Sequence, residues 1–151
     1  MPPRSEVPLT AIRQQITIDA PLRAVWNALT TDDGLARWWG TAARVDARAG
    51  GRIVLTQAGV DGSAVELRGM FHEFRPTRKI EIAWDGVGAS PSKGTRVAFQ
   101  VARDGEETHV SVVHSGGGAL ADDAQRAALD EGWRSALLRL RSALEDSPTA
   151  S

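Results

Sequence analysis

The chain is 151 residues long, which suits a single domain that buries about two thirds of the surface exposed by its unfolded form. Its apolar content of 42% is too high for a disordered protein, and its formal net charge of −1 gives no electrostatic reason to expect nucleic acid or an anionic membrane as a partner. Cysteine is absent, which excludes disulfides, a catalytic thiol and cysteine metal sites.

Targeting signals are not apparent in the sequence. The first ten residues lack the apolar core of a secretory signal, and no apolar run approaches the roughly 20 residues of a membrane span. We therefore expect a soluble, cytoplasmic protein without membrane insertion. Tyrosine is absent whereas tryptophan occurs five times, which supplies large apolar rings for a pocket.

The first part of the chain predicts one strand and two short helices. Residues 1–11 contain three prolines and are expected to be a flexible N-terminus. Alternating isoleucines predict a strand over Ile12 to Ile18. A short helix follows, with Pro21 at an early position, where its missing N–H costs nothing. A second short helix follows Thr30 and ends near Gly40, a typical C-terminal stop.

The middle of the chain predicts a series of antiparallel strands. Their expected ranges are Arg52 to Ala58, Ala64 to Phe74, Arg78 to Trp84, Thr95 to Ala102 and Thr108 to Ser115. Asp61-Gly62 is a hairpin signal between the first two. In the second, Val65 and Leu67 lie on one face whereas Met70 and Phe74 lie on the other, which predicts a bulge at Gly69.

A long amphipathic helix is predicted from Ala121 to Leu144. One face carries its apolar residues, which are Leu129, Trp133, Ala136, Leu140 and Leu144. Asp122 suits the helix start, and Ser147-Pro148 ends the helix. Two residues disturb the pattern: Gln125 lies on the apolar stripe, and Gly132 costs about 1 kcal/mol relative to alanine. Gln125 and Gly132 are both explained if this helix forms the wall of a cavity.

The order of elements favours an α+β layer architecture in one domain. We expect that domain over residues 12–146, followed by a flexible C-terminus over residues 147–151. No internal repeat and no linker of domain-separating length is apparent.

Eight short phrases in the sequence suggest a family by their order and spacing: IDAPLRAVWNALT from Ile18, LARWWG from Leu35, AGGRI from Ala49, Gly69-Met70-Phe71, Ile82-Ala83-Trp84, GTRVAF from Gly94, VVHSG from Val112 and GWRSALLRL from Gly132. With these phrases the chain resembles the SRPBCC superfamily, whose fold is the START-like or birch-pollen-allergen-like helix-grip, and within it the branch named for the activator of heat-shock-protein-90 ATPase. This resemblance implies a curved antiparallel sheet of about six to seven strands that wraps around the C-terminal helix. It also implies an elongated, largely apolar cavity between them.

Members of this superfamily include lipid and polyketide binders, cyclases, hydrolases and co-chaperone domains, so fold alone does not fix function. The eukaryotic co-chaperones carry an additional N-terminal domain that makes much of the chaperone contact. Only about a dozen residues precede the helix-grip domain here, which makes contact with a chaperone doubtful. A homodimer is compatible with the resemblance.

Ten residues are candidates for the wall of the cavity. They are Trp38, Trp39, Phe71, Trp84, Phe99, His114, Gln125, Leu129, Gly132 and Trp133. The neighbouring Trp38 and Trp39 point in different directions, which favours one in the core and one near the cavity mouth. Trp84 and Trp133 lie on inner faces, where core and ligand surface coincide, and indoles bind flat or apolar ligands.

The polar candidates have alternative interpretations. His114 follows the inward alternation of its strand and would serve as a ligand contact or an acid–base group, or as a satisfied residue bonded to the 116–118 loop. Gln125 holds the polar end of a ligand or lies in a solvated first turn. Gly132 reflects either close approach of another segment or space for the ligand. The three histidines lack metal-ligand spacing, so we expect no metal and no cofactor.

Three functions remain open from the sequence. The leading hypothesis is a binding protein for a small, mostly hydrophobic molecule. The second is a cyclase- or hydrolase-type enzyme that uses the same cavity, with His114 as the base. The third is an interaction module for a chaperone or regulator, which would present an exposed apolar patch instead of a cavity.

Overall fold

The computed structural model describes residues 11–58, 62–85, 93–116, 120 and 122–145. Its elements in chain order are β1 (Ile12–Ile18), α1 (Leu22–Thr30), α2 (Asp32–Trp38), β2 (Ala42–Val45), β3 (Arg52–Ala58), β4 (Ala64–Arg75), β5 (Lys79–Trp84), β6 (Arg96–Asp104), β7 (Glu107–Ser115) and α3 (Asp123–Glu145). The described strands form one sheet of seven in the order β1-β7-β6-β5-β4-β3-β2. All neighbouring pairs are antiparallel.

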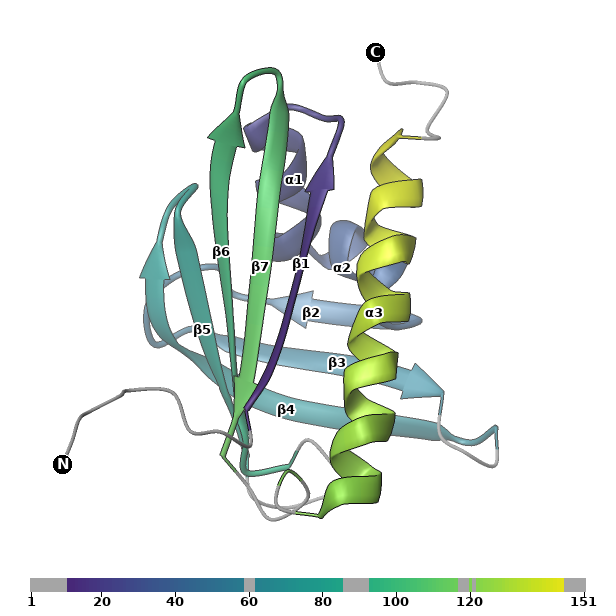
Figure 1. Cartoon of the computed structure of the whole chain (residues 1–151). Coiled ribbons are helices and arrows are strands. Elements are labelled where there is room, and N and C mark those ends of the chain that lie inside the picture. The colour runs from purple at the N-terminus through teal and green to yellow at the C-terminus, as the bar shows by residue number, and fades with distance from the viewer. Residues whose placement is uncertain (1–10, 59–61, 86–92, 117–119, 121, 146–151) are drawn as a thin grey trace, which may run out of the picture.

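The sheet is strongly curved, and α3 spans its concave side (Figure 1). In this view β2, β3 and β4 run crosswise to β1, β6 and β7, and the two short helices lie farther from the viewer, α1 behind β1 and β7 and α2 between β1 and α3. This is the α+β helix-grip architecture that the sequence predicts. A register shift between β4 and β5 contributes to the bend, because a bulge increases local twist.

The long helix begins one turn before the pocket described below. The backbone N–H of Gln125 donates to Asp122 Oδ1 over 3.0 Å, which satisfies one of the unpaired amides at the helix start. The fully buried face of α3 comprises Trp133, Ala136, Leu137 and Leu140. The predicted helix and its inner face are therefore correct to within two residues at each end, apart from Leu137, which the predicted stripe omits.

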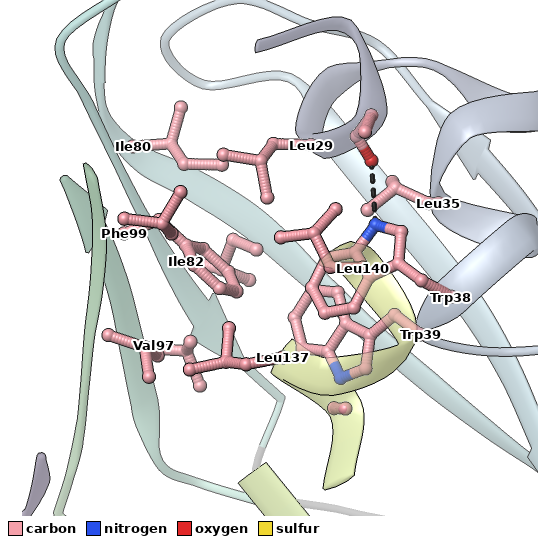
Figure 2. Packing of buried hydrophobic residues seen from close by; sticks show 14 of the residues in the cluster. Leu29, Leu35, Trp38, Trp39, Ile80, Ile82, Val97, Phe99, Leu137 and Leu140 are labelled. Atoms are coloured by element: carbon pink, nitrogen blue, oxygen red, sulfur yellow. Dashed lines mark hydrogen bonds between the residues drawn. The ribbon is translucent and has the colours of Figure 1, made fainter. Parts of the chain in front are cut away.

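The concave side of the sheet is filled by large side chains. Figure 2 shows Trp38, Trp39 and Phe99 packed among aliphatic residues from α1, α3, β5 and β6. The Trp38 indole N–H donates to the backbone oxygen of Ala28 over 2.8 Å, so the ring is buried without leaving a polar atom unpaired. A long open cavity, which the family resemblance implies, is therefore replaced over much of this interface by an aromatic core.

Within the sheet, one strand was missed by the sequence analysis and the predicted position of the bulge is wrong. The strand β2 was not predicted; it pairs with β3 between Ala42↔Thr56 and Val45↔Ile53. The phase change in β4 lies after Phe71, between that residue and Glu73, and not at Gly69. Met70 consequently faces outward with 39% of its surface exposed, whereas Phe71 is fully buried.

Several predicted features fall wholly or partly outside the described residues. They are the flexible ends at 1–11 (apart from Ala11) and 147–151, Asp61 of the hairpin signal, and most of the 116–118 loop. The hairpin itself is present, because β3 and β4 pair as far as Ala58↔Ala64. None of the described helices is long and apolar enough to cross a membrane.

Candidate ligand-binding pocket

A pocket of about 270 Å³ remains between α3 and the strands β3 to β5. It is lined by Trp39, Gln57, Ala58, Leu67, Trp84, Ala128, Leu129, Gly132, Trp133, Ala136 and Arg139. Four segments that are distant in the sequence therefore meet here: the end of α2, the β3–β4 hairpin, the end of β5 and the middle of α3.

Small residues on α3 create the space on the helix side. Ala128, Gly132 and Ala136 recur every four residues, so they lie on one helix face, and all three line the pocket. A Cβ built on Gly132 would meet no atom within 4 Å, its own helix excepted. The glycine is therefore not required by the close approach of a strand or loop. Of the two explanations that the sequence leaves open, the structure favours open space.

Trp39 is the centre of the aromatic wall. Its ring centroid lies 5.8 Å from that of Trp84 and 5.3 Å from that of Trp133, with which it lines the pocket. Behind these rings, Trp39 stacks on Trp38 at 5.4 Å and meets the ring of Phe99 edge-on at 5.4 Å. Such mutual contacts hold the indoles in fixed orientations, which lowers the ordering cost of binding.

Gly69 on β4 permits the position of Trp84. A Cβ at Gly69 would lie 2.8 Å from Cε3 of the Trp84 ring and 2.6 Å from the backbone oxygen of Ala83. Gly69 and Trp84 are direct partners in the antiparallel β4–β5 pair. The absence of a side chain at Gly69 therefore lets the indole lie over the neighbouring strand.

Gln57 and Arg139 are the polar groups of the pocket wall. Gln57 Nε2 donates to the backbone oxygen of Trp39 over 2.9 Å. Arg139 Nε donates to the backbone oxygen of Trp38 over 3.0 Å. Both side chains are thus tied to the end of α2, where the last carbonyls of a helix lack intrahelical partners.

His114 lies behind the pocket wall and supports it. Trp133 Nε1 donates to His114 Nδ1 over 2.9 Å. Because an indole N–H can only donate, Nδ1 must be unprotonated, and the proton on Nε2 points to Thr95 Oγ1 at 2.8 Å. Burial lowers the pKa of His114 from 6.5 to about 4, so the ring is neutral at pH 7. Among the described residues, its hydrogen-bond partners are Thr95 and Trp133; most of the 116–118 loop lies outside them.

The structure brings together five of the ten predicted wall residues: Trp39, Trp84, Leu129, Gly132 and Trp133. Among the others, Trp38 and Phe99 pack behind the wall, and His114 bonds to Trp133. Phe71 lies elsewhere in the same core and does not line the pocket; its ring meets that of Phe74 at 5.3 Å. Gln125 lies exposed in the first turn of α3.

Six wall residues were not predicted: Gln57, Ala58, Leu67, Ala128, Ala136 and Arg139. The four-residue spacing of Ala128, Gly132 and Ala136 is a signal that was available in the sequence. No local sequence pattern identifies Gln57 or Arg139 as wall residues, because both side chains are positioned by hydrogen bonds to the end of α2. Within the part of the chain that the structure describes, no group of three or more His, Asp or Glu side chains is placed to hold a metal ion.

Several solved structures have a fold similar to that of this chain. The solution structure of the Aha1 dimer from Colwellia psychrerythraea is 27% identical, with a TM-score of 0.67, over 89% of this chain and 96% of that one. The AHSA1-like protein from Aeromonas hydrophila is 23% identical, with a TM-score of 0.71, over 89% and 93% of the two chains. DynU16, described as a protein in the dynemicin biosynthetic locus, is 24% identical, with a TM-score of 0.76, over 91% of this chain but 48% of that one.

A search among proteins of curated function found no significant match. The family model described as "Activator of Hsp90 ATPase homolog 1-like protein" matches residues 19–145. That range spans both short helices, most of the sheet and all of α3. It confirms the resemblance seen in the sequence. The chain therefore belongs to the family of activator of Hsp90 ATPase homolog 1-like proteins.

Proposed function

We propose that this protein binds a small, largely apolar ligand in the pocket between α3 and the strands β3 to β5. The observation that carries the proposal is the open space beside Gly132, which faces three indole rings. A glycine inside a helix costs about 1 kcal/mol relative to alanine, so its presence at the pocket wall is explained if the space is used.

The size and lining of the pocket limit the ligand. Its volume of about 270 Å³ lies just below the range of about 300–1,000 Å³ that is typical of sites for drug-sized molecules. A compact ligand of a few rings therefore fits better than a long lipid chain. The rings of Trp39, Trp84 and Trp133 favour a flat partner, which gains both buried area and stacking.

Binding is preferred over catalysis because of what lines the pocket. The described wall consists of indole, alkyl, amide and guanidinium groups and includes no imidazole, carboxyl or thiol group, which are common general acids and bases. His114, the candidate base, uses both ring nitrogens for contacts within the protein. A cyclase or hydrolase reaction would need an acid or base from elsewhere.

The assembly state forms part of the proposal. The relative from Colwellia psychrerythraea is described as a dimer. We propose that the present chain also forms a homodimer. Light scattering behind a sizing column measures the mass directly. A monomeric mass at micromolar concentration would contradict the dimer and leave the pocket proposal intact.

A substitution that fills the pocket tests the binding function. Calorimetric titration of naphthylethanol, a neutral bicyclic probe, should give saturable binding to the wild type. Gly132→Leu places a branched side chain in the open space and should abolish that binding. Ser142→Leu, at an exposed position of α3 outside this pocket, is the matched control and should bind as the wild type does. Absence of binding to the wild type, or unchanged affinity in Gly132→Leu, would overturn the proposal.

A further inference from the structure

Arg139 gives the apolar pocket a single positive charge. It is the one charged residue among the described residues that line the pocket. None of the described lining residues carries a carboxylate, so none of them neutralises the guanidinium. A carboxylate on the ligand would therefore find an opposite charge at this place and no like charge among the described wall residues.

Two other arginines on α3, Arg126 and Arg134, have acidic partners. Arg126 lies 2.7 Å from Asp123 and Arg134 lies 3.7 Å from Glu131, each pair three residues apart on the helix. For Arg139, no carboxylate of the described residues lies within the 4.0 Å that defines an ion pair. It differs from Arg126 and Arg134 in having no such partner, and among the arginines of α3 it is the one that lines the pocket.

The guanidinium of Arg139, an exposed residue, is anchored through one of its nitrogens. Its Nε donates to the backbone oxygen of Trp38, a residue 101 positions away in the chain. This bond leaves the two terminal nitrogens available as a parallel pair of donors, the geometry that matches the two oxygens of a carboxylate. Because the anchor is a backbone atom at the end of α2, the donor pair is positioned before a ligand arrives.

Gln57 adds a second oriented donor on the sheet side. Its Nε2 faces the carbonyl oxygen of Trp39, which can only accept, so the amide nitrogen and not its oxygen must lie there. The second hydrogen of that nitrogen is left for another acceptor. Arg139 and Gln57 thus place donors on two sides of a pocket whose remaining described wall is apolar or indole.

We propose that the ligand carries a carboxylate on a flat apolar body, and that Arg139 binds this carboxylate through its two terminal nitrogens. The inference rests on the proposed ligand-binding function and adds the charge of the ligand to it. A monoanion fits better than a phosphate dianion, because the wall supplies one cation. The apolar body lies against Trp39, Trp84 and Trp133.

A matched pair of probes tests the charge separately from the apolar body. Naphthylacetate and naphthylethanol share the ring system and differ in carrying a carboxylate or a hydroxyl group. In calorimetric titration at low salt, the wild type should bind naphthylacetate about tenfold more tightly, the order expected for a charge-assisted hydrogen-bonded pair. Added salt should weaken the binding of naphthylacetate and leave that of naphthylethanol unchanged.

Variants assign the preference to the proposed residue. Arg139→Met keeps the length of the side chain but removes the charge, so the preference for naphthylacetate should disappear. Arg134→Met removes a charge from the same helix outside the pocket and should retain the tenfold preference. Circular dichroism shows whether the Arg139→Met variant is folded.

The outcomes distinguish the two proposals. If naphthylethanol binds the wild type as tightly as naphthylacetate does, or if Arg139→Met retains the preference, the carboxylate inference is overturned while the binding function stands. If neither probe binds the wild type, both are overturned. If Arg139→Met does not fold, the salt dependence in the wild type decides: equal salt dependence of the two probes would contradict the inference.

Discussion

A single buried histidine connects the pocket wall to the sheet. His114 is 1% exposed, and it accepts from Trp133 on α3 while donating to Thr95, which precedes β6. Protonation would place a hydrogen on Nδ1, opposite the indole N–H of Trp133, and two donors would then face each other. The ionised ring therefore both loses a hydrogen bond and lies in an apolar environment.

The stability of the protein should accordingly fall in mild acid. The pKa of His114 is near 6.5 in the unfolded chain and about 4 in the folded one, so between these values the unfolded state binds more protons. The contribution of His114 is fully present above pH 6.5 and is lost as the pH falls towards 4. At pH 5 the free energy of unfolding should be lower than at pH 7 by about 2 kcal/mol from this residue.

Urea denaturation at the two pH values measures this loss, and His114→Gln is the control. Glutamine can still accept from Trp133 and donate to Thr95 but does not titrate, so the variant should show a smaller loss. Equal pH dependence in the wild type and the variant would contradict the assignment of a neutral, buried imidazole.

Gly69 should tolerate no side chain. A methyl group there meets the backbone of Ala83 and the ring of Trp84 at less than 3 Å, so the β4–β5 pair or the indole must move. Gly69→Ala should lower the free energy of unfolding by about 1–3 kcal/mol, the usual cost of overpacking. Denaturant titration would detect this as a lower midpoint with an unchanged slope. A midpoint equal to that of the wild type would show that Trp84 does not lie over this glycine.

At the scale of elements, α3 is the best predicted part of the molecule. Its apolar spacing predicts the helix and its inner face because burial on one side imposes a period of about 3.6 residues. The departure at Gly132 was visible in the sequence, but its reason was not, since a glycine is compatible with both close contact and open space. The structure distinguishes the two, because a Cβ built on Gly132 would meet no atom within 4 Å, its own helix excepted.

Gly132→Ala should therefore stabilise the protein. Alanine gains about 1 kcal/mol of helix propensity, and the added methyl group meets no neighbour. Thermal unfolding should show a higher melting temperature, opposite in sign to the effect of Gly69→Ala. Ligand affinity should fall at the same time, because the methyl group takes part of the pocket. A lower melting temperature would show that another segment approaches the helix at this position.

The errors in the sheet also have physical reasons. The strand β2 has four residues and is paired on one side only, so neither its length nor an apolar alternation marks it in the sequence. The bulge in β4 follows Phe71 because the register with β5 changes there, and register is a property of two strands together. In the sequence, Gly69 predicts the position of the bulge, but in the structure this glycine makes room for the ring of Trp84.

At the scale of the whole molecule, the sequence predicts the order of elements, the fold class and the family. These depend on local patterns and on phrases that are continuous in the chain. The pocket depends on distant contacts, such as those of Arg139 with Trp38 and of Gln57 with Trp39, which no local pattern encodes. Only half of the predicted wall residues line the pocket. The sequence pattern shows that a residue points inward, but it does not show whether that residue lies in the core or at the pocket surface.

The packing of α3 against the sheet should determine whether the molecule folds. Leu140 is fully buried at this interface. Leu140→Asp would bury an unpaired charge, at a cost comparable to the total stability of about 5–15 kcal/mol of a typical domain. Circular dichroism should show a largely unfolded protein at 25 °C and neutral pH. A cooperative transition within a degree of the wild-type melting temperature would contradict the position of Leu140.

The central claim is that a small apolar ligand binds between α3 and the strands β3 to β5. The indole N–H signals in a proton–nitrogen NMR spectrum test it most directly, because the five tryptophans give separate resonances that Trp→Phe variants assign. Titration with naphthylacetate should shift the signals of Trp39, Trp84 and Trp133 saturably, with one dissociation constant. Trp26, which packs against Phe74 away from the pocket, should not shift. A saturable shift of Trp26 without shifts of Trp84 and Trp133 would contradict the claim.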